Sequence, residues 1–413
     1  MGGSSRPFFG WYVVFACFWI AVFGWGFGFY GHAVYLAELQ QLHGWPAGLI
    51  GGATTAYYLV GAALLAAFSA AADRLGMRPV LLAGLAAMAA SVASLPFVTA
   101  IWQLYAAYLL MAVGWATMSI TAITTILAPW FLRRRGLAIA LALTGASFGG
   151  ILVVPALVHL EGRYGFRAAM LAMAAAMLLL LVPMVLLLIR ERPQAMGLLP
   201  DGDVAAGPAR EGGDAARRVS RAALLRDRGF WSVAAPFALA LMAQVGFIVH
   251  QIAVLEPAIG RERAGLAVAL TTFAAVAGRI GLGFVVDRLD QRATSAASLA
   301  SQAAALLVIA RADDAAVLYL ACILFGLSVG NLITLPALIV QREFGAAAFG
   351  AVIGLVTGIG QVTYAFGPGL LGVVRDLAGG YGAALALCIL LQIAAAVGLL
   401  AGRRTAVPAA EPE

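Results

Sequence analysis

The chain of 413 residues contains no lysine and little charge of any kind. Charged residues make up 11% of it, whereas a soluble domain carries about 25% to keep its surface hydrated. Hydrophobic residues make up 63%, and the mean hydropathy is +0.96. This composition excludes a soluble globular protein, and it also excludes a disordered chain. We therefore predict a protein that lies in a lipid bilayer and crosses it many times.

Cysteine is also scarce. Cys17, Cys322 and Cys388 lie far apart in apolar stretches, and their number is odd. We interpret them as buried thiols with no redox or metal role, and the sequence predicts neither a metal site nor a cofactor. The N-terminus lacks a short apolar region that ends at a small-residue cleavage site, so we expect no removable signal peptide.

A membrane-spanning helix needs about 20 apolar residues. Twelve segments meet this length, and they predict an all-α polytopic protein with two six-helix halves: 11–36, 48–71, 79–97, 102–129, 137–159 and 167–189, then 230–255, 264–286, 293–310, 315–340, 347–373 and 381–402. The expected domains are an N-terminal half over 1–189, a polar linker over 190–229, and a C-terminal half with a short tail over 230–413. A short amphipathic helix is expected over 214–228.

The arginines are distributed unevenly between the two ends of these segments. Nineteen of the 26 fall on the side of the termini and the linker, six fall on the opposite side, and Arg279 alone lies inside a span. Because arginine is enriched on the cytoplasmic side, both termini and the linker are predicted to be cytoplasmic. The net charge of +7 then reflects topology, and nucleic-acid binding is excluded.

The two halves repeat each other. Asp73-Arg74 recurs 214 residues later as Asp287-Arg288, Gly136 recurs as Gly350, and Pro155 recurs 213 residues later as Pro368. These matches occur in the same order along both halves, which indicates a duplicated six-helix unit. Paired halves of this kind place a substrate site near the membrane midplane and expose it alternately to either side.

The loop over 69–78 contains Asp73-Arg74, Gly76 and Arg78, and resembles the G-x-x-x-D-R-x-G-R-R/K pattern of the major facilitator superfamily. Ser69 and Met77 depart from that pattern. The resemblance covers about residues 8–402 and implies the major facilitator fold. It also implies that Asp73, Arg74, Arg78, Asp287 and Arg288 form a latch at the cytoplasmic mouth, although these charges are also explained by topology alone.

Within this superfamily the chain looks most like the bacterial branch of monocarboxylate porters and oxalate/formate exchangers. The likeness rests on residues 128–136, on Val249-His250, and on residues 278–283. It implies that Arg279 binds the substrate carboxylate. Two departures matter: 343–374 lacks the basic residue of oxalate exchangers, and Ala275 stands where animal monocarboxylate porters carry an aspartate. One cation suits a monocarboxylate, and the coupling scheme of the animal proteins does not carry over.

Arg279 is the most informative residue in the sequence. Eight residues before Asp287, it lies about 12 Å inside the membrane, which is too deep to reach water easily. None of the 19 acidic residues is expected at its depth. A guanidinium binds a carboxylate through two parallel hydrogen bonds, so Arg279 predicts a site for a small organic anion. Helix-end carbonyls and hydroxyls are the alternative partners.

Other polar residues at mid-depth are weaker candidates for the substrate site. These are Asn331, Tyr58, Tyr364, Thr117 and Gln361, although such a residue alone more often forms a hydrogen bond between helices than a ligand contact. His250 is a candidate for proton coupling or gating, with a packed structural histidine as the alternative. His32 is expected to be interfacial. In helix 1 the alternating glycines over 24–31 predict a weakened, bendable segment.

These features predict a secondary transporter of a small monocarboxylate such as lactate or pyruvate, coupled to protons and acting by alternating access. The alternatives are an organic-anion exchanger, an exporter of amphipathic compounds, and a transporter-like sensor. An enzyme is not expected, because the spans show no catalytic pairing of acids or nucleophiles. We expect a monomer in the inner membrane of a bacterium.

Overall fold

A computed structural model describes residues 8–190, 192–202 and 221–402. Helices make up nearly all of these residues, as the apolar segments predict. The first half contains α1 (Gly10–Trp25), η1 (Gly26–Tyr30), α2 (Gly31–His43), α3 (Ala47–Leu75), α4 (Met77–Ser94), η2 (Leu95–Phe97), α5 (Ile101–Met118), α6 (Ile120–Leu127), α7 (Arg135–Phe148), η3 (Gly149–Val153) and α8 (Val154–Leu188).

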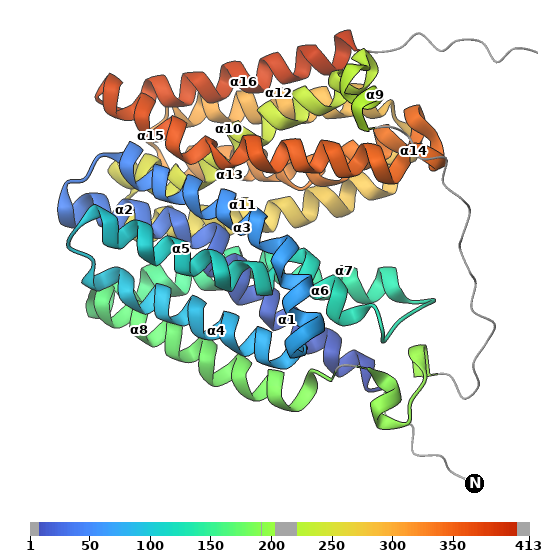
Figure 1. The fold of residues 1–413 in the computed structure, drawn as a ribbon. Helices are drawn as coiled ribbons and strands as arrows, with labels where there is room; N and C mark the ends of the chain where they lie inside the picture. The colour runs from blue at the N-terminus through green and yellow to red at the C-terminus, as the bar shows by residue number, and fades with distance from the viewer. Residues whose placement is uncertain (1–7, 191, 203–220, 403–413) are drawn as a thin grey trace, which may run out of the picture.

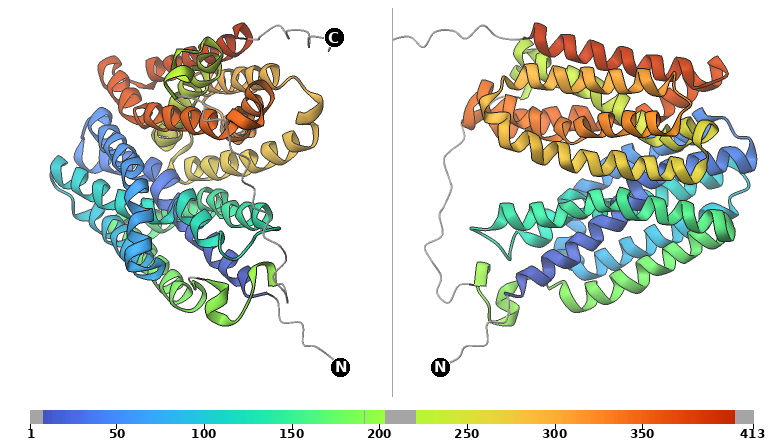
Figure 2. Two further views of the ribbon diagram at one scale, coloured as in Figure 1. Left: turned by 45° about the vertical axis from the view of Figure 1, so that its right-hand side comes forward. Right: turned by 180° about the vertical axis from the view of Figure 1, so that it is seen from behind.

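The second half begins after the short linker elements η4 (Pro193–Met196), η5 (Pro200–Gly202) and α9 (Arg221–Arg226). It contains α10 (Arg228–Ile259), α11 (Arg261–Val285), η6 (Val286–Arg288), α12 (Gln291–Ile309), α13 (Ala315–Val329), α14 (Asn331–Ala365), α15 (Gly367–Ala378) and α16 (Tyr381–Ala401). Of the predicted amphipathic helix over 214–228, α9 is the described part, and residues 214–220 lie outside the described chain. The two groups of helices form separate bundles (Figures 1 and 2).

Eleven helical stretches among the described residues are long and apolar enough to cross a membrane. One of them, Arg135–Leu188, has 54 residues and would be about 80 Å long if it were straight. It turns at Gly165, whose φ of 78° breaks the helix between predicted spans 5 and 6. The stretch therefore accounts for two crossings, in agreement with the twelve predicted spans.

Two spans contain π-helical segments that touch each other. The glycine-rich stretch of helix 1 forms η1, and η3 lies in helix 5. A Cβ on Gly26 would come within 2.6 Å of Val153, and one on Gly149 within 2.6 Å of the Gly26 nitrogen. Glycine is required here because the two backbones approach too closely for a side chain. The expected weak point in helix 1 is thus a local change of helix type.

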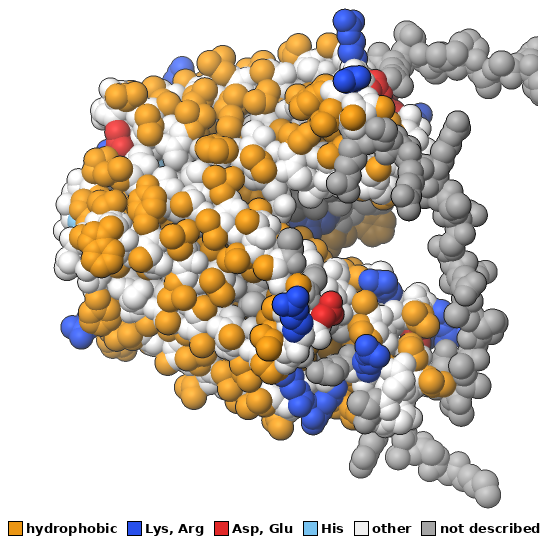
Figure 3. Space-filling view, in the orientation of Figure 1, with side chains coloured by type: hydrophobic (Ala, Val, Ile, Leu, Met, Phe, Trp, Pro, Cys, Tyr) orange, Lys and Arg blue, Asp and Glu red, His pale blue; other side chains and the backbone are white. Residues whose placement is uncertain are grey.

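We name the two ends of the bundle by what they carry. The linker face bears α9, the start of α7 and the end of α3. The opposite end, which we call the closed face, bears the start of α3 and the end of α15. The halves converge at the closed face and diverge toward the linker face (Figure 2, right). Figure 3 shows a hollow between them that opens at the linker face.

Glycines seal the closed face where α3 meets α15. A Cβ on Gly372 would lie 2.5 Å from the Ala47 carbonyl oxygen, and one on Gly51 would collide with the Pro368 carbonyl. Further along α3, Tyr58 forms an edge-to-face ring pair with Tyr364 of α14. From Ala47 to Tyr58 the seal extends about 16 Å along α3.

Asp376 strengthens this seal by capping a helix of the other half. Its carboxylate accepts hydrogen bonds from the backbone nitrogens of Ala47 at 3.1 Å and Gly48 at 2.7 Å, at the start of α3. The N-terminus of α3 has no side-chain cap of its own, because Pro46 stands at that position. A carboxylate is favoured there by the helix dipole and by the free N–H groups.

At the linker face, Asp201 attaches the linker to the loop before α7. Its carboxylate accepts from the backbone nitrogens of Leu132 at 2.9 Å, Arg133 at 2.9 Å and Arg134 at 3.3 Å. Partial burial alone would raise the pKa of Asp201, but these three hydrogen bonds outweigh it and lower the pKa. The linker is therefore held against the N-terminal half near its start.

We predict that Gly51→Val opens the closed face. The new side chain collides with the backbone of Pro368, which cannot swing aside, so the halves must separate at this seam. Double electron–electron resonance between spin labels at Trp102 and Arg311, one on each half, should then show a larger population at long distances. Gly162→Val is the matched control, because a Cβ on Gly162 meets no atom within 4 Å. An unchanged distance distribution in Gly51→Val would contradict the seal.

Candidate functional site

Arg279 lies near the linker-face end of α11, six residues before the helix ends at Val285. Its side chain leans toward the start of the helix, and so into the protein. It packs against the junction of α13 and α14, where a Cβ on Gly330 would lie 3.0 Å from the Arg279 Cβ and 3.1 Å from its Nε. Nε is buried and has no hydrogen-bond partner among the described residues.

The group from the opposite half that interacts with Arg279 is Tyr30, at the end of the π-helical segment η1. Its hydroxyl lies within hydrogen-bonding reach of Thr272 and within electrostatic range of Arg279. No carboxylate of the described chain forms an ion pair with Arg279. The guanidinium thus lies between the halves, with a phenol as its polar neighbour and no counter-ion among the residues that the structure describes.

Tyr58 and Tyr364 close this site on the side of the closed face. Their ring centroids are 5.3 Å apart and the rings are nearly perpendicular, at 85°. The Tyr58 hydroxyl is buried without a hydrogen-bond partner in the described chain. The Tyr364 hydroxyl interacts with Gln361, one turn earlier on α14. Three of the residues predicted from the sequence therefore lie together.

Asn331 follows Gly330 and so lies beside the residue that Arg279 packs against. Its Nδ2 donates to Ser298 Oγ at 3.3 Å, which fixes the orientation of the amide. Its Oδ1 is buried, and within the described structure nothing donates to it. An acceptor that is buried and unpartnered is costly, so this oxygen is available to a donor from a bound molecule.

Thr117 lies elsewhere. Its hydroxyl donates to the Gly114 carbonyl at 2.8 Å within α5. The side chain fills the space over Gly84, where any Cβ would collide with it. Thr117 therefore packs α5 against α4 inside the N-terminal half, and we do not include it in the site.

His250 is completely buried, and both of its ring nitrogens are engaged. Nε2 lies 2.9 Å from the Pro368 carbonyl oxygen, and Nδ1 lies 3.0 Å from the Tyr381 hydroxyl. Because a carbonyl only accepts, Nε2 carries the proton and Nδ1 accepts from Tyr381. The neutral ring is satisfied in this arrangement. Through Pro368 it also contacts the segment that seals the closed face.

His32 is not interfacial, as its position near a helix end led us to expect. It is fully buried and surrounded by aromatic rings, with centroids 4.7 Å from Tyr57, 5.0 Å from Tyr108 and 5.8 Å from both Tyr35 and Tyr58. The error arose because helix 1 extends to His43, so His32 lies about 16 Å inside that end. Within this cage, Tyr58 is the ring that also contacts Tyr364 of the other half.

The latch residues lie at the linker face, where the halves are apart. Asp73 and Arg74 are exposed at the end of α3, and Arg288 is exposed at the end of η6. Arg78 instead donates to the Ile189 carbonyl and attaches α4 to the end of α8. The side chain of Asp287 lies outside the described part of the structure. Within the described chain, the exposed members form no ion pair across the halves.

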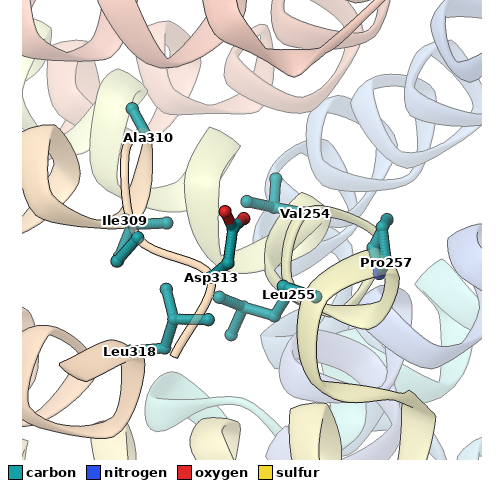
Figure 4. A pocket seen from close by; sticks show the side chains of 9 residues that line it. Val254, Leu255, Pro257, Ile309, Ala310, Asp313 and Leu318 are labelled. Carbon is teal, nitrogen blue, oxygen red and sulfur yellow. The ribbon is translucent and has the colours of Figure 1, made fainter. Parts of the chain in front are cut away.

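A separate pocket of about 200 Å³ opens near the closed face of the C-terminal half (Figure 4). It lies between the ends of α10 and α12 and the start of α13, and Asp313 is its one charged lining residue in the described chain. This pocket is distant from Arg279 and is lined mainly by apolar side chains. Elsewhere in the described chain no group of three His, Cys, Asp or Glu residues is placed to hold a metal ion.

Two helical bundles with a largely buried arginine between them are consistent with a membrane transport protein, and the comparisons with known proteins identify the family. The family model of the Major Facilitator Superfamily matches residues 15–368, and the chain belongs to this superfamily. It is a transporter and not an enzyme.

Related sequences and structures are consistent with this family. The chain is 29% identical over 338 residues to monocarboxylate transporter 11 of Mus musculus, covering 78% of this chain and 71% of that protein. It is 37% identical over 110 residues to monocarboxylate transporter 13 of Rattus norvegicus, covering 26% and 25%.

Solved structures share the fold at low identity. A mutant form of the nucleoside transporter NupG superposes with a TM-score of 0.76 at 13% identity, covering 96% of this chain and all of that one. An inward-facing, occupied bacterial homolog of the human lysosomal transporter Spinster superposes with a TM-score of 0.70 at 15% identity, covering 97% and 96%.

Proposed function

We propose that the protein is a proton-coupled secondary transporter of a small monocarboxylate. The observation that carries this proposal is the largely buried guanidinium of Arg279, whose Nε has no hydrogen-bond partner and which has no counter-ion among the described residues. An arginine inside a membrane is costly without a partner, and a substrate carboxylate supplies one through two charge-assisted hydrogen bonds. The relatives that are named monocarboxylate transporters support the same substrate class.

The polar groups near Arg279 can form hydrogen bonds with a polar substituent next to the substrate carboxylate. The Tyr58 hydroxyl can donate to an oxygen, and Asn331 Oδ1 can accept from a hydroxyl, and both groups are buried and unpartnered within the described chain. A 2-hydroxy or 2-oxo acid such as lactate or pyruvate presents such an oxygen beside its carboxylate. The aromatic side chains around His32 and Tyr58 would surround the apolar remainder. Gln361 holds Tyr364 in place.

The seal and the hollow support transport by alternating access. In this structure the closed face is sealed by α3 and α15, and the site opens at the linker face. With the linker face in the cytoplasm, as the arginine bias indicates, this is the inward-open state in the inner membrane of a bacterium. We assign His250 to gating through Pro368, and the latch of Asp73, Arg74, Arg78, Asp287 and Arg288 to the opposite, outward-open state. A monomer contains the whole site.

This orientation predicts the pattern of thiol labelling in intact cells. The native cysteines are buried, so they contribute little background. A cysteine replacing Gln194, exposed in the linker, should react with an impermeant reagent only after the cells are opened. A cysteine replacing Arg163, exposed at the closed face, should react from outside. The reverse pattern would invert the assigned topology.

Substitution of Arg279 tests the substrate site. Arg279→Lys keeps the charge but loses the planar fork, so monocarboxylate affinity should fall about tenfold. Arg279→Ala loses both hydrogen bonds and the charge, and affinity should fall about 100-fold. The melting temperature should not fall, because the alanine removes an unpaired buried charge. Affinity is measured by calorimetry and stability by thermal unfolding, both in nanodiscs.

Arg292 serves as the comparison for Arg279 in the stability measurement, because its guanidinium has a carboxylate partner. It is buried, and its guanidinium binds Glu343 at 2.6 and 2.8 Å. Arg292→Ala leaves that carboxylate without its partner and should lower stability by about 3 kcal/mol. Retained affinity in Arg279→Ala would refute the assignment. A loss of stability in Arg279→Ala as large as that in Arg292→Ala would show that Arg279 has a structural role.

A further inference from the structure

A largely buried arginine at the closed face has more acidic partners than one cation can neutralise. Arg261, the first residue of α11, contacts Glu38 Oε2 at 2.7 Å, Glu161 Oε1 at 2.8 Å and Glu256 Oε1 at 3.6 Å. Its side chain is 17% exposed, that of Glu38 is 10% exposed and that of Glu161 is 8% exposed. We call these four residues the closed-face cluster.

The cluster joins the two halves. Glu38 lies on α2 and Glu161 on α8, both in the N-terminal half, whereas Arg261 and Glu256 belong to the C-terminal half. Arg261 also donates to Gln41 Oε1 at 3.1 Å, again across the boundary. When the halves separate at this face, Arg261 must leave Glu38 and Glu161, while those two acids remain together.

The charges in the cluster do not balance. Three carboxylates and one guanidinium give a net charge of −2 when all are ionised, in a site that is largely buried. Glu38 and Glu161 lie within hydrogen-bonding reach of each other, and Glu161 Oε2 is buried with no donor among the described groups. Two carboxyl groups can form a hydrogen bond only when one of them is protonated.

Few other charges surround this pair. Glu262 is 82% exposed and lies 3.5 Å from His159, which is half exposed, so this second pair is largely hydrated. Glu256 is directed to the same guanidinium and adds negative charge. These neighbours cannot neutralise the excess, because the one buried cation of the described chain in contact with the pair is Arg261 itself.

We propose that Glu38 and Glu161 form a proton-binding site that is occupied when Arg261 seals the closed face. The bound proton bridges the two carboxyls, with one Glu as donor and the other as acceptor, while Arg261 holds the remaining oxygens. Closing this face therefore takes up one proton from the solution on that side. By linkage, acid on that side favours the closed arrangement seen here. The assignment of this proton to coupled transport rests on the proposed function, whereas the site itself does not.

The site is tested without any substrate. Spin labels at Trp102 and Arg311, with the native cysteines replaced by alanine, report closure of this face in nanodiscs between about pH 5 and 9, a range that begins near the ordinary pKa of a glutamate carboxyl and extends well above it. In the parent protein the closed population should rise as the pH falls. Glu161→Gln mimics the protonated pair and should stay closed throughout that range. Glu38→Gln should also stay closed, so it replaces Glu161→Gln in the test if that variant does not fold.

Glu262→Gln is the matched control, because Glu262 is adjacent to Arg261 in sequence but exposed. It should retain the pH dependence of the parent. A parent protein whose closure does not change with pH would overturn the proposal. So would a Glu161→Gln or Glu38→Gln variant that titrates like the parent.

Uptake into proteoliposomes separates this proposal from the proposed function. Accumulation driven by a pH gradient should be lost in Glu161→Gln, while exchange of monocarboxylate for monocarboxylate continues. If closure titrates but no monocarboxylate is transported by the parent, the proposed function fails and the proton site stands. If gradient-driven accumulation is the same in Glu161→Gln and in the parent, the proton of coupled transport is bound elsewhere.

Discussion

A guanidinium inside a membrane protein needs a partner for its charge, and three arginines inside this protein differ in the partners that the described residues give them. Arg292 has one carboxylate, Glu343, and holds α12 to the end of α14's first segment. Arg261 has three carboxylates and joins the halves at the closed face. Arg279 has none among the described residues. The first arrangement is structural, whereas we propose that the second responds to protons and that the third leaves a place for an anionic substrate.

The two sites at the closed face and the centre are mechanically connected. The seam of α3 and α15 extends from the Asp376 cap at Ala47 to the rings of Tyr58 and Tyr364, which close the space above Arg279. Opening the closed face breaks that cap and the cluster around Arg261, and it also separates the two tyrosines. We therefore expect the proposed proton site at Glu38 and Glu161 to be coupled to the proposed substrate site through the helices, without direct contact.

Much of the fold was predictable because span length and arginine bias are local properties of the sequence. The twelve crossings, the weak glycine segment of helix 1 and the exceptional status of Arg279 all follow from single segments. The grouping of Tyr58, Tyr364 and Gln361 followed from their common depth. Thr117 has the same depth but points into its own half, which spacing alone does not reveal.

The interactions between halves could not be predicted. Nothing in the sequence connects Arg261, Glu38 and Glu161, and only the packing of α2, α8 and α11 shows that they meet. The Asp376 cap depends on residues 328 and 329 positions apart. The aromatic cage of His32 was missed because helix 1 is longer than its most apolar part. The depth of a residue along a predicted span identifies candidates for the site, whereas the packing of the helices determines which residues they contact.

The central claim is that the site recognises negative charge through Arg279. The most direct measurement is the affinity of the unmodified protein for a 2-hydroxy monocarboxylate and for its primary amide, which have nearly the same shape, by calorimetry in nanodiscs. The account predicts that the amide binds at least about 100-fold more weakly, because it cannot neutralise the guanidinium. Equal affinities for the acid and the amide would contradict it.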